Sequence, residues 1–171
     1  MSPDRHWQPY PSSDHSPLIA PDKKMTMTPY QHARQSHAHC VVCGKTEENS
    51  SPFDLHFTPD GDSGVCASFQ VTTQHQGYTG LQHGGITATL LDAAMTHCLF
   101  RQGVMAVTAE LTVRYLAPIQ IGDRLQVAAC VVQQRHTIYQ LEASLCREAK
   151  IVARATAKFI RPRTGGFGHE R

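Results

Sequence analysis

The sequence predicts an α+β protein in which one long helix packs against an antiparallel sheet. Residues 84–100 carry apolar side chains at helical spacing on more than one face, which is typical of a buried helix. Four later segments alternate apolar and polar residues with a period of two, which is typical of half-buried strands. With two shorter segments before the helix, we expect five or six antiparallel strands around it.

Each expected element has its own local signal. Before the helix, a short strand over residues 54–58 leads into a turn at Pro59-Asp60-Gly61, and a second strand covers residues 65–72. Gly84-Gly85 opens the helix. The alternating segments after it, joined by short connections, are residues 107–115, 125–131, 139–145 and 151–159.

The chain divides into three parts by composition. Residues 1–35 are poor in aliphatic side chains and rich in proline, so we expect a disordered or loosely ordered segment. Its prolines are Pro3, Pro9, Pro11, Pro17, Pro21 and Pro29. Residues 36–163 form a single predicted domain, and residues 164–171 a flexible tail. The whole chain has 171 residues, which is enough for one hydrophobic core.

Charge and hydropathy exclude several classes of function. A formal net charge of +2, without a basic stripe, argues against nucleic-acid binding. No apolar run approaches the ~18 residues that a membrane-spanning helix needs. The N-terminus lacks the pattern of a secretory signal, so we expect a cytoplasmic protein that makes no membrane contact.

The cysteines indicate free thiols rather than a disulfide framework. Of the six, four lie within apolar strand or helix patterns, where cysteine behaves as a small hydrophobic residue. The segment from His37 to Gly44 contains a Cys-x-x-Cys pair with nearby histidines, the ligand types of a zinc site. A second pair at zinc-finger spacing is missing. We therefore interpret this segment as a turn, and predict no metal and no cofactor.

A carboxylate inside the apolar helix is the main functional signal. Asp92 shares one stripe of the helix with Gly85, Thr89 and Thr96, three or four residues apart. One interpretation is a buried structural carboxylate held by hydrogen bonds. The other is that this stripe forms the wall of a site for acyl chemistry, which the helix start favours.

His83-Gly84-Gly85 supplies unpaired backbone N–H groups at a helix N-terminus, where the peptide dipoles favour negative charge. Such a turn suits the oxyanion that develops on a carbonyl under attack. Seven residues separate Gly85 from Asp92, which is about 10 Å along a helix axis. Because one carbonyl cannot contact both in the same chain, we predict a homodimer whose site is shared between subunits.

The segment QHGGITATLLDAA at residues 82–94, with its acid nine residues after the histidine, resembles the hotdog-fold acyl-CoA thioesterases. The likeness is strongest to the phenylacetate-pathway type within the 4-hydroxybenzoyl-CoA thioesterase superfamily. It extends over residues 40–162, beginning at CVVCG (40–44) and including AVTAELTVRYLAPIQIGD (106–123). The resemblance implies a hotdog fold, in which an antiparallel sheet wraps around one central helix.

The resemblance also implies roles for individual residues. Gly84 would donate its N–H to the thioester carbonyl, with Gly85 assisting, and Asp92 would act as base or nucleophile. Thr108 on the next strand would assist Asp92, and in relatives with another arrangement the equivalent residue is Thr96. His83 is expected to hold the turn, with direct contact to the thioester as the alternative.

One position departs from the family pattern. Many members carry Asn or Gln six residues before the histidine to hold the carbonyl or the water, whereas this chain has Gly77. Gln76 or Gln82 is a candidate substitute. Candidate contacts for the phosphates of coenzyme A are Arg114, Lys158, Arg161 and Arg163.

The leading functional hypothesis is hydrolysis of an acyl-CoA thioester to the free acid and coenzyme A. The expected partners are an acyl-CoA substrate and a second copy of the chain, as a homodimer or a dimer of dimers (homotetramer). The alternative is a non-catalytic protein that binds acyl-CoA on the same fold, and a weaker third is an acyl dehydratase. The acyl chain itself depends on a tunnel that the sequence does not specify.

Overall fold

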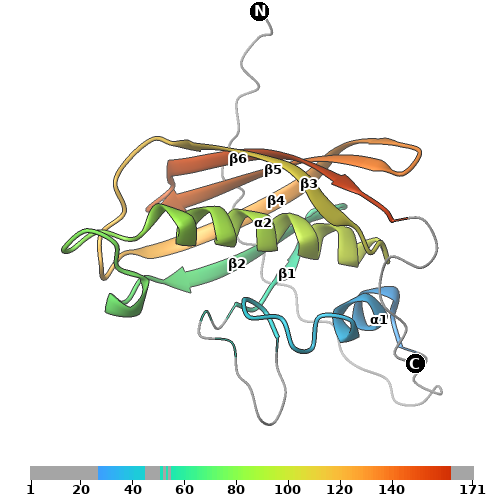
Figure 1. Ribbon diagram of the computed structural model, residues 1–171, viewed down its shortest axis with the longest axis horizontal. Helices are drawn as coiled ribbons and strands as arrows, with labels where there is room; N and C mark the ends of the chain where they lie inside the picture. Colours follow the sequence, from blue (N-terminus) through green and yellow to red (C-terminus); the bar gives the residue numbers. More distant parts are fainter. Residues whose placement is uncertain (1–26, 45–50, 52, 54, 163–171) are drawn as a thin grey trace, which may run out of the picture.

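The computed structural model describes residues 27–44, 51, 53 and 55–162 (Figure 1). Two helices and a short 3-10 turn accompany six strands in this part of the chain. The helical elements are α1 (Pro29–Gln35), η1 (Thr73–His75) and α2 (Gly84–Arg101). The strands are β1 (Thr58–Asp60), β2 (Gly64–Gln70), β3 (Val107–Tyr115), β4 (Arg124–Arg135), β5 (Ile138–Arg147) and β6 (Lys150–Ile160).

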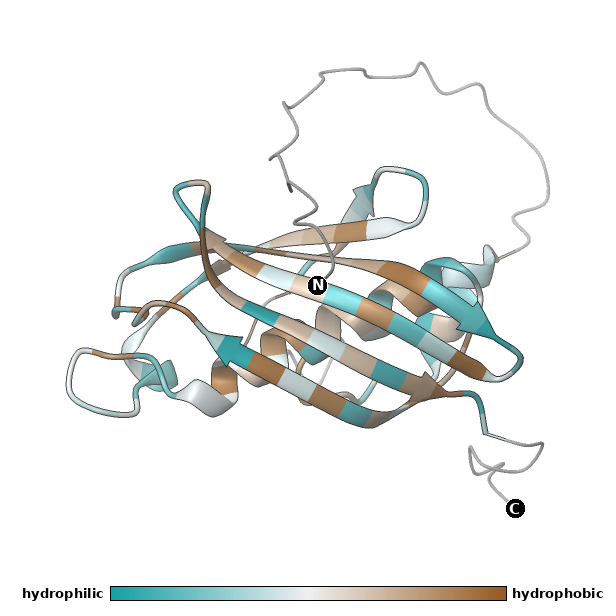
Figure 2. Ribbon diagram, turned by 90° about the horizontal axis from the view of Figure 1, so that it is seen from above, coloured by the Kyte–Doolittle hydropathy of each residue, from teal (hydrophilic) through white to brown (hydrophobic). Residues whose placement is uncertain are grey.

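The strands form one antiparallel sheet in the order β1-β2-β4-β5-β6-β3, and α2 lies across one face of it (Figure 1). Hydrophobic and hydrophilic residues alternate along the strands, so that one face turns to the helix and the other to solvent (Figure 2). The predicted α+β class, with a sheet wrapped around one long helix, is confirmed.

The core lies between α2 and the curved sheet. Leu90, Leu91 and Met95 of the helix are fully buried there. Facing them from the strands are the buried side chains Leu125, Val127, Leu141, Leu145 and Phe159. Complete burial on most sides of α2 explains why its apolar residues exceed a single stripe.

The first strand lies later than expected. The prediction was a strand over residues 54–58, but β1 covers Thr58–Asp60 and pairs with the start of β2. Pro59, expected in the turn, lies in this strand, where its missing N–H is tolerated because β1 is at the edge of the sheet. The chain reverses at Gly61, whose φ of 58° suits glycine. Asp54 lies outside the described residues.

Helix α1 occupies residues for which we expected loose order. Thr28 and Gln31 form a reciprocal capping box and Pro29 starts the helix, so its N-terminus is well satisfied. Ala33 is buried, and the Tyr30 hydroxyl lies 2.9 Å from Nδ1 of the buried His97. The expectation was therefore wrong for residues 29–35. Residues 1–26 and the predicted tail 164–171 lie outside the described residues.

Strand β3 forms the other edge of the sheet and is more exposed than the predicted half-buried strand. Val107 is 48% and Tyr115 is 55% exposed. Some apolar side chains of β3 therefore remain exposed to solvent in the single chain. No helix among the described residues is long and apolar enough to cross a membrane.

Candidate active site

The turn before α2 is held by its own histidine. His83 is the N-cap residue, and its Nδ1 accepts a hydrogen bond from the Gly85 N–H at 2.9 Å. That nitrogen is therefore unprotonated, so a neutral His83 carries its proton on Nε2. Both glycine N–H groups were expected to face a carbonyl, but the Gly85 N–H is already engaged by this cap. Within the described residues the Gly84 N–H has no hydrogen-bond partner.

A pocket of about 280 Å³ lies beside this first turn, and Gly84 lines it together with Tyr115 and Gln82. The Tyr115 hydroxyl donates to the Gly84 carbonyl at 2.9 Å, which ties the end of β3 to the helix start. The side-chain nitrogen and oxygen of Gln82 are buried and lack a partner among the described residues. An unpaired buried amide is costly, and its place in a pocket indicates a ligand-binding role.

The departure from the family pattern at Gly77 has a steric basis. A Cβ added at Gly77 would lie 3.0 Å from the His83 Cα, so the turn packs closely against this glycine. Of the two candidate substitutes, Gln76 already accepts a hydrogen bond from the Gly80 N–H at 3.0 Å. Gln82 is the one whose amide lines the pocket beside Gly84.

Asp92 lies two turns further along α2 and is paired with Thr108. The Thr108 hydroxyl donates to Asp92 Oδ1 at 2.7 Å. Burial raises the pKa of Asp92, while the Thr108 hydrogen bond and the charge of His37 act in the opposite direction. Burial is the largest of these effects, so the pKa of Asp92 lies above its ordinary range. A carboxylate with a raised pKa is better suited to accept a proton near neutral pH.

A β-bulge directs Thr108 toward the helix. Thr108 pairs with Phe159 of β6, whereas Glu110 pairs with Lys158, so the register shifts at Ala109. Side chains two apart on a regular strand share a face, but the extra residue places Thr108 and Glu110 on opposite faces. The regular alternation predicted for residues 107–115 would put the two side chains on one face, and it is wrong at this bulge. Glu110 instead forms an exposed ion pair with Lys158 at 2.6 Å.

The polar stripe of α2 lines a second pocket, of about 360 Å³. Thr89, Asp92 and Thr96 contribute from the helix and Leu111 from β3. The predicted wall is thus present, although Gly85 is not among its lining residues. Between the two candidate hydroxyls, Thr108 binds Asp92, and Thr96 makes no hydrogen bond to that carboxylate in the described part of the chain.

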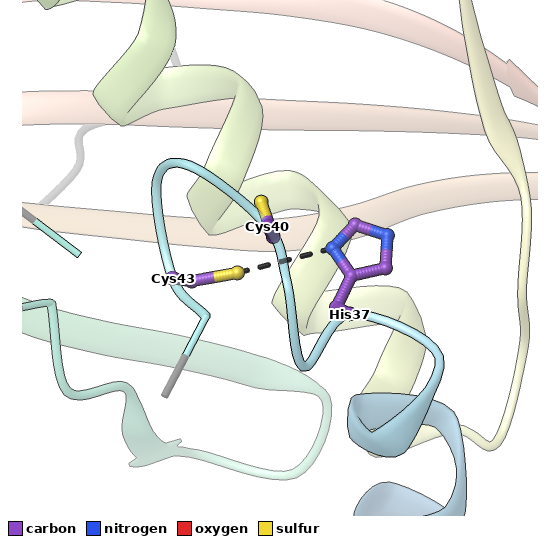
Figure 3. A group of neighbouring side chains, drawn as sticks. All are labelled: His37, Cys40 and Cys43. Carbon is purple, nitrogen blue, oxygen red and sulfur yellow. Dashed lines mark hydrogen bonds between the residues drawn. The ribbon is translucent and has the colours of Figure 1, made fainter. Parts of the chain in front are cut away.

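The turn after α1 was not expected at this pocket. Its residues His37, Cys40, Val42 and Cys43 line the pocket together with Asp92. Figure 3 shows the side chains of His37, Cys40 and Cys43. The turn itself was predicted, and all six cysteines of the chain are free in the structure. Its position over the middle of α2 follows from long-range packing, including an edge contact between the rings of His37 and Phe100 at 4.8 Å. In the sequence, the spacing of His37, Cys40 and Cys43 was the signal that these residues could act together.

Three of the cationic residues expected to bind phosphate lie at the surface, on β3, on β6 and at the residue that follows β6. Arg114, Lys158 and Arg161 are all exposed. Lys158 is engaged by Glu110, while Arg114 lies opposite Arg154 in the β3–β6 register. Arg163 lies outside the described residues. The structure therefore does not bring these cations together with Asp92 or Gly84 as one site in a single chain.

Residues 79–153 match the family model described as Thioesterase superfamily. The sequence is 32% identical over 76 residues to acyl-coenzyme A thioesterase 13 of Mus musculus, covering 43% of this chain and 54% of that protein. For the Homo sapiens protein of the same name the identity is 29% over 93 residues, covering 52% and 66%. The matched part thus spans between about half and two thirds of these relatives.

Solved structures show the same fold. The E. coli PaaI protein from the phenylacetic acid degradation operon has a TM-score of 0.63 at 22% identity, covering 77% of this chain and 95% of that one. The smu.793 protein of Streptococcus mutans, solved with acetyl CoA, has a TM-score of 0.62 at 22% identity, covering 70% and 97%. The resemblance to hotdog-fold acyl-CoA thioesterases is confirmed.

Proposed function

We propose, from the match of residues 79–153 to the Thioesterase superfamily, that this protein hydrolyses an acyl-CoA thioester to the free acid and coenzyme A. The observation that carries the proposal is the Thr108–Asp92 pair at 2.7 Å in a pocket along α2. A carboxylate that is partly desolvated and oriented by a hydroxyl is a suitable general base or nucleophile. The structure supports Asp92 in either role.

Asp92 can promote thioester hydrolysis by two routes. As a base, Asp92 takes a proton from water while the water oxygen attacks the carbonyl carbon, and the thiolate of coenzyme A leaves and is protonated. As a nucleophile, Asp92 attacks the carbonyl carbon and expels the thiolate of coenzyme A, which is protonated; water then hydrolyses the resulting anhydride to the free acid and regenerates Asp92. Thr108 holds the carboxylate in both cases, and the hydroxyl can donate to only one acceptor at a time.

The oxyanion that forms in either route needs hydrogen-bond donors. We assign this role to the Gly84 N–H, because the Gly85 N–H is used by His83. His83 would thus hold the turn rather than touch the thioester. We further assign the buried Gln82 amide to the carbonyl or the attacking water, in place of the Asn or Gln that relatives carry where this chain has Gly77.

The site requires a second copy of the chain in this proposal. Gly84 and Asp92 line different pockets, about 12 Å apart along the helix axis at eight residues and 1.5 Å per residue. β3 is an exposed sheet edge, and Val107 and Tyr115 on it leave apolar surface uncovered. A homodimer that covers this edge would bring Gly84 of one subunit near Asp92 of the other. A dimer of dimers would leave this shared site unchanged.

We retain Arg114, Lys158 and Arg161 as candidate contacts for the phosphates of coenzyme A. Their charge and exposure support the assignment, although Lys158 would have to leave Glu110. No metal or cofactor is needed for either chemical route.

The test is release of coenzyme A from a panel of acyl-CoAs, quantified by chromatography because free protein cysteines react with thiol dyes. We expect turnover by the wild type and a loss of about 10²–10⁴-fold in kcat for Asp92→Asn, which keeps the shape but cannot accept the proton. Asp62→Asn, at an exposed carboxylate, is the matched control and should be active.

Two results would contradict this proposal. Binding of acyl-CoA by a folded wild type without release of coenzyme A would indicate the non-catalytic alternative. Near wild-type kcat in Asp92→Asn would make Asp92 structural.

A further inference from the structure

Beside the proposed catalytic pair lies a group of three side chains with no part in that chemistry. One ligand atom each from His37, Cys40 and Cys43 lies within 4.8 Å of the others (Figure 3). His37 Nδ1 and Cys43 Sγ are 3.8 Å apart. An imidazole and two thiols form the ligand set that zinc prefers.

The spacing of these atoms suits a tetrahedral metal ion. Zinc binds sulfur at about 2.3 Å and histidine nitrogen at about 2.0–2.1 Å, which places the two ligand atoms about 3.6 Å apart in a tetrahedron. The observed 3.8 Å between His37 Nδ1 and Cys43 Sγ differs from this by a few tenths of an ångström. All three ligand atoms lie within 4.8 Å of one another, so rotations about the side-chain bonds can bring them around one ion.

The backbone of the turn is shaped to keep the two cysteines close. The Cys40 N–H donates to the His37 carbonyl at 3.0 Å, and the Gly44 N–H donates to the Cys40 carbonyl at 2.8 Å. A Cβ at Gly44 would lie 2.5 Å from the carbonyl oxygens of Ala38 and Cys40. The turn thus closes so tightly that only glycine fits at residue 44, and the backbone that carries the two cysteines is fixed without an ion.

The environment of the ligands also favours a cation. Cys43 is 5% exposed, so its thiol is largely shielded from bulk water. Asp92 lines the same pocket and adds negative charge nearby.

We propose that His37, Cys40 and Cys43 bind one Zn²⁺ ion, with the fourth coordination position toward the pocket that Asp92 and Thr96 also line. Binding releases the two thiol protons to solvent and leaves two thiolates on the ion. Three protein ligands and an open position leave room for water or a ligand atom. The ion would fasten the turn after α1 against α2 and so form one wall of the pocket. This site is independent of the proposed hydrolysis.

The test measures metal content. The full-length protein is stripped with chelator under reducing conditions, incubated with Zn²⁺, desalted and analysed by elemental mass spectrometry. We expect one zinc per chain in the wild type and less than one tenth of that in Cys43→Ser and His37→Gln. Cys66→Ser and Cys130→Ser are matched controls that keep the other cysteines, and they should retain one zinc.

Cobalt substitution keeps the proposal testable even where a variant unfolds. Co²⁺ added to the stripped wild type should give a thiolate-to-cobalt charge-transfer band that Zn²⁺ abolishes. The proposal would be overturned if the stripped wild type bound neither Zn²⁺ nor Co²⁺. It would also be overturned if the Cys43→Ser variant bound as much zinc as the wild type. So would a Cys40–Cys43 disulfide in freshly purified protein, recognised by a 2 Da mass loss and by thiol titration, that persists under reduction.

Discussion

The first and third turns of α2 each line a pocket, but the two pockets are assembled in different ways. Beside the first turn, His83 caps Gly85 two residues away, and the Gly84 N–H has no partner in the described part of the chain, so neighbours in the sequence make the site. Beside the third turn, Asp92 depends on Thr108 and on the turn containing Cys43, both distant in the sequence. Local sequence can therefore specify the first-turn pocket, whereas the third-turn pocket depends on the tertiary fold.

The largest effects are expected when the functional group of one pocket is removed at a time. Asp92→Asn should spoil the acid and Gly84→Pro the N–H donor, and each homodimer should lose at least about 100-fold in kcat. Proline is compatible with this position, because His83 has extended φ and ψ of −66° and 133°. The atoms nearest to a Cβ at Gly84 belong to Tyr115, at 3.5 Å, which is an ordinary van der Waals distance.

Mixing the two inactive chains then reports whether the pockets combine across subunits. Statistical mixing makes half the dimers mixed, and each mixed dimer has one intact site of two, so about a quarter of wild-type activity should return. Native mass spectrometry should verify the mixed dimers. If activity stays absent although mixed dimers form and Gly84→Pro folds, acid and donor come from the same chain.

A smaller effect is expected from the hydroxyl that orients the acid. Thr108→Val keeps the side-chain shape but removes the hydrogen bond that lowers the pKa of Asp92. Because Asp92 must be ionised to react, kcat/KM falls as the pH drops through its pKa. In Thr108→Val this acidic limb should move to higher pH, with about a tenfold lower kcat.

Thr96→Val is the matched control for the same pocket, since Thr96 lines it without bonding Asp92 in the described residues. Its acidic limb should coincide with that of the wild type, measured at equal zinc content. A shifted limb in Thr96→Val and an unmoved one in Thr108→Val would reverse the assignment of the two hydroxyls.

The smallest expected loss of activity concerns the first-turn pocket. Gln82→Met should reduce kcat/KM several-fold, because the amide that we assign to the substrate is gone. The same change should raise the free energy of unfolding by about 1 kcal/mol, since an unpaired buried amide is replaced by an apolar side chain. Reduced activity with unchanged or raised Tm supports the assignment, whereas wild-type kcat/KM would reduce Gln82 to a packing residue.

Much of the fold was predictable because its signals are local. The long helix, its start at Gly84 and the four strands after it follow from periodicity and were found within a few residues. Helix α1 was missed although Thr28, Pro29 and Gln31 carry its capping signal, because the proline content of the segment outweighed that pattern. The error in β1 has a similar cause, since Pro59 indicates a turn unless its place at a sheet edge is known.

The candidate site was predictable only in part. Asp92 stands out because a carboxylate in an apolar helix is unusual. Its pairing with Thr108 was implied by the family resemblance and not by periodicity, which placed Thr108 on the face of Glu110. The difference is the bulge at Ala109, which depends on pairing with β6 and leaves no mark in the local sequence. The nearness of Cys43 to Asp92 likewise depends on packing between segments distant in the chain.

The bulge on β3 makes the count of residues as important as their identity. Ala109 is the extra residue of the bulge, so deleting its codon would place Thr108 directly beside Glu110 in a regular strand and leave the Thr108 hydroxyl facing α2. Deleting the codons for both Ala109 and Glu110 would instead pair Thr108 with Lys158 and turn the hydroxyl to the solvent side of the sheet. Among diverging copies of this gene, the loss of one residue here would therefore spare the Asp92–Thr108 pair, whereas the loss of two would break it.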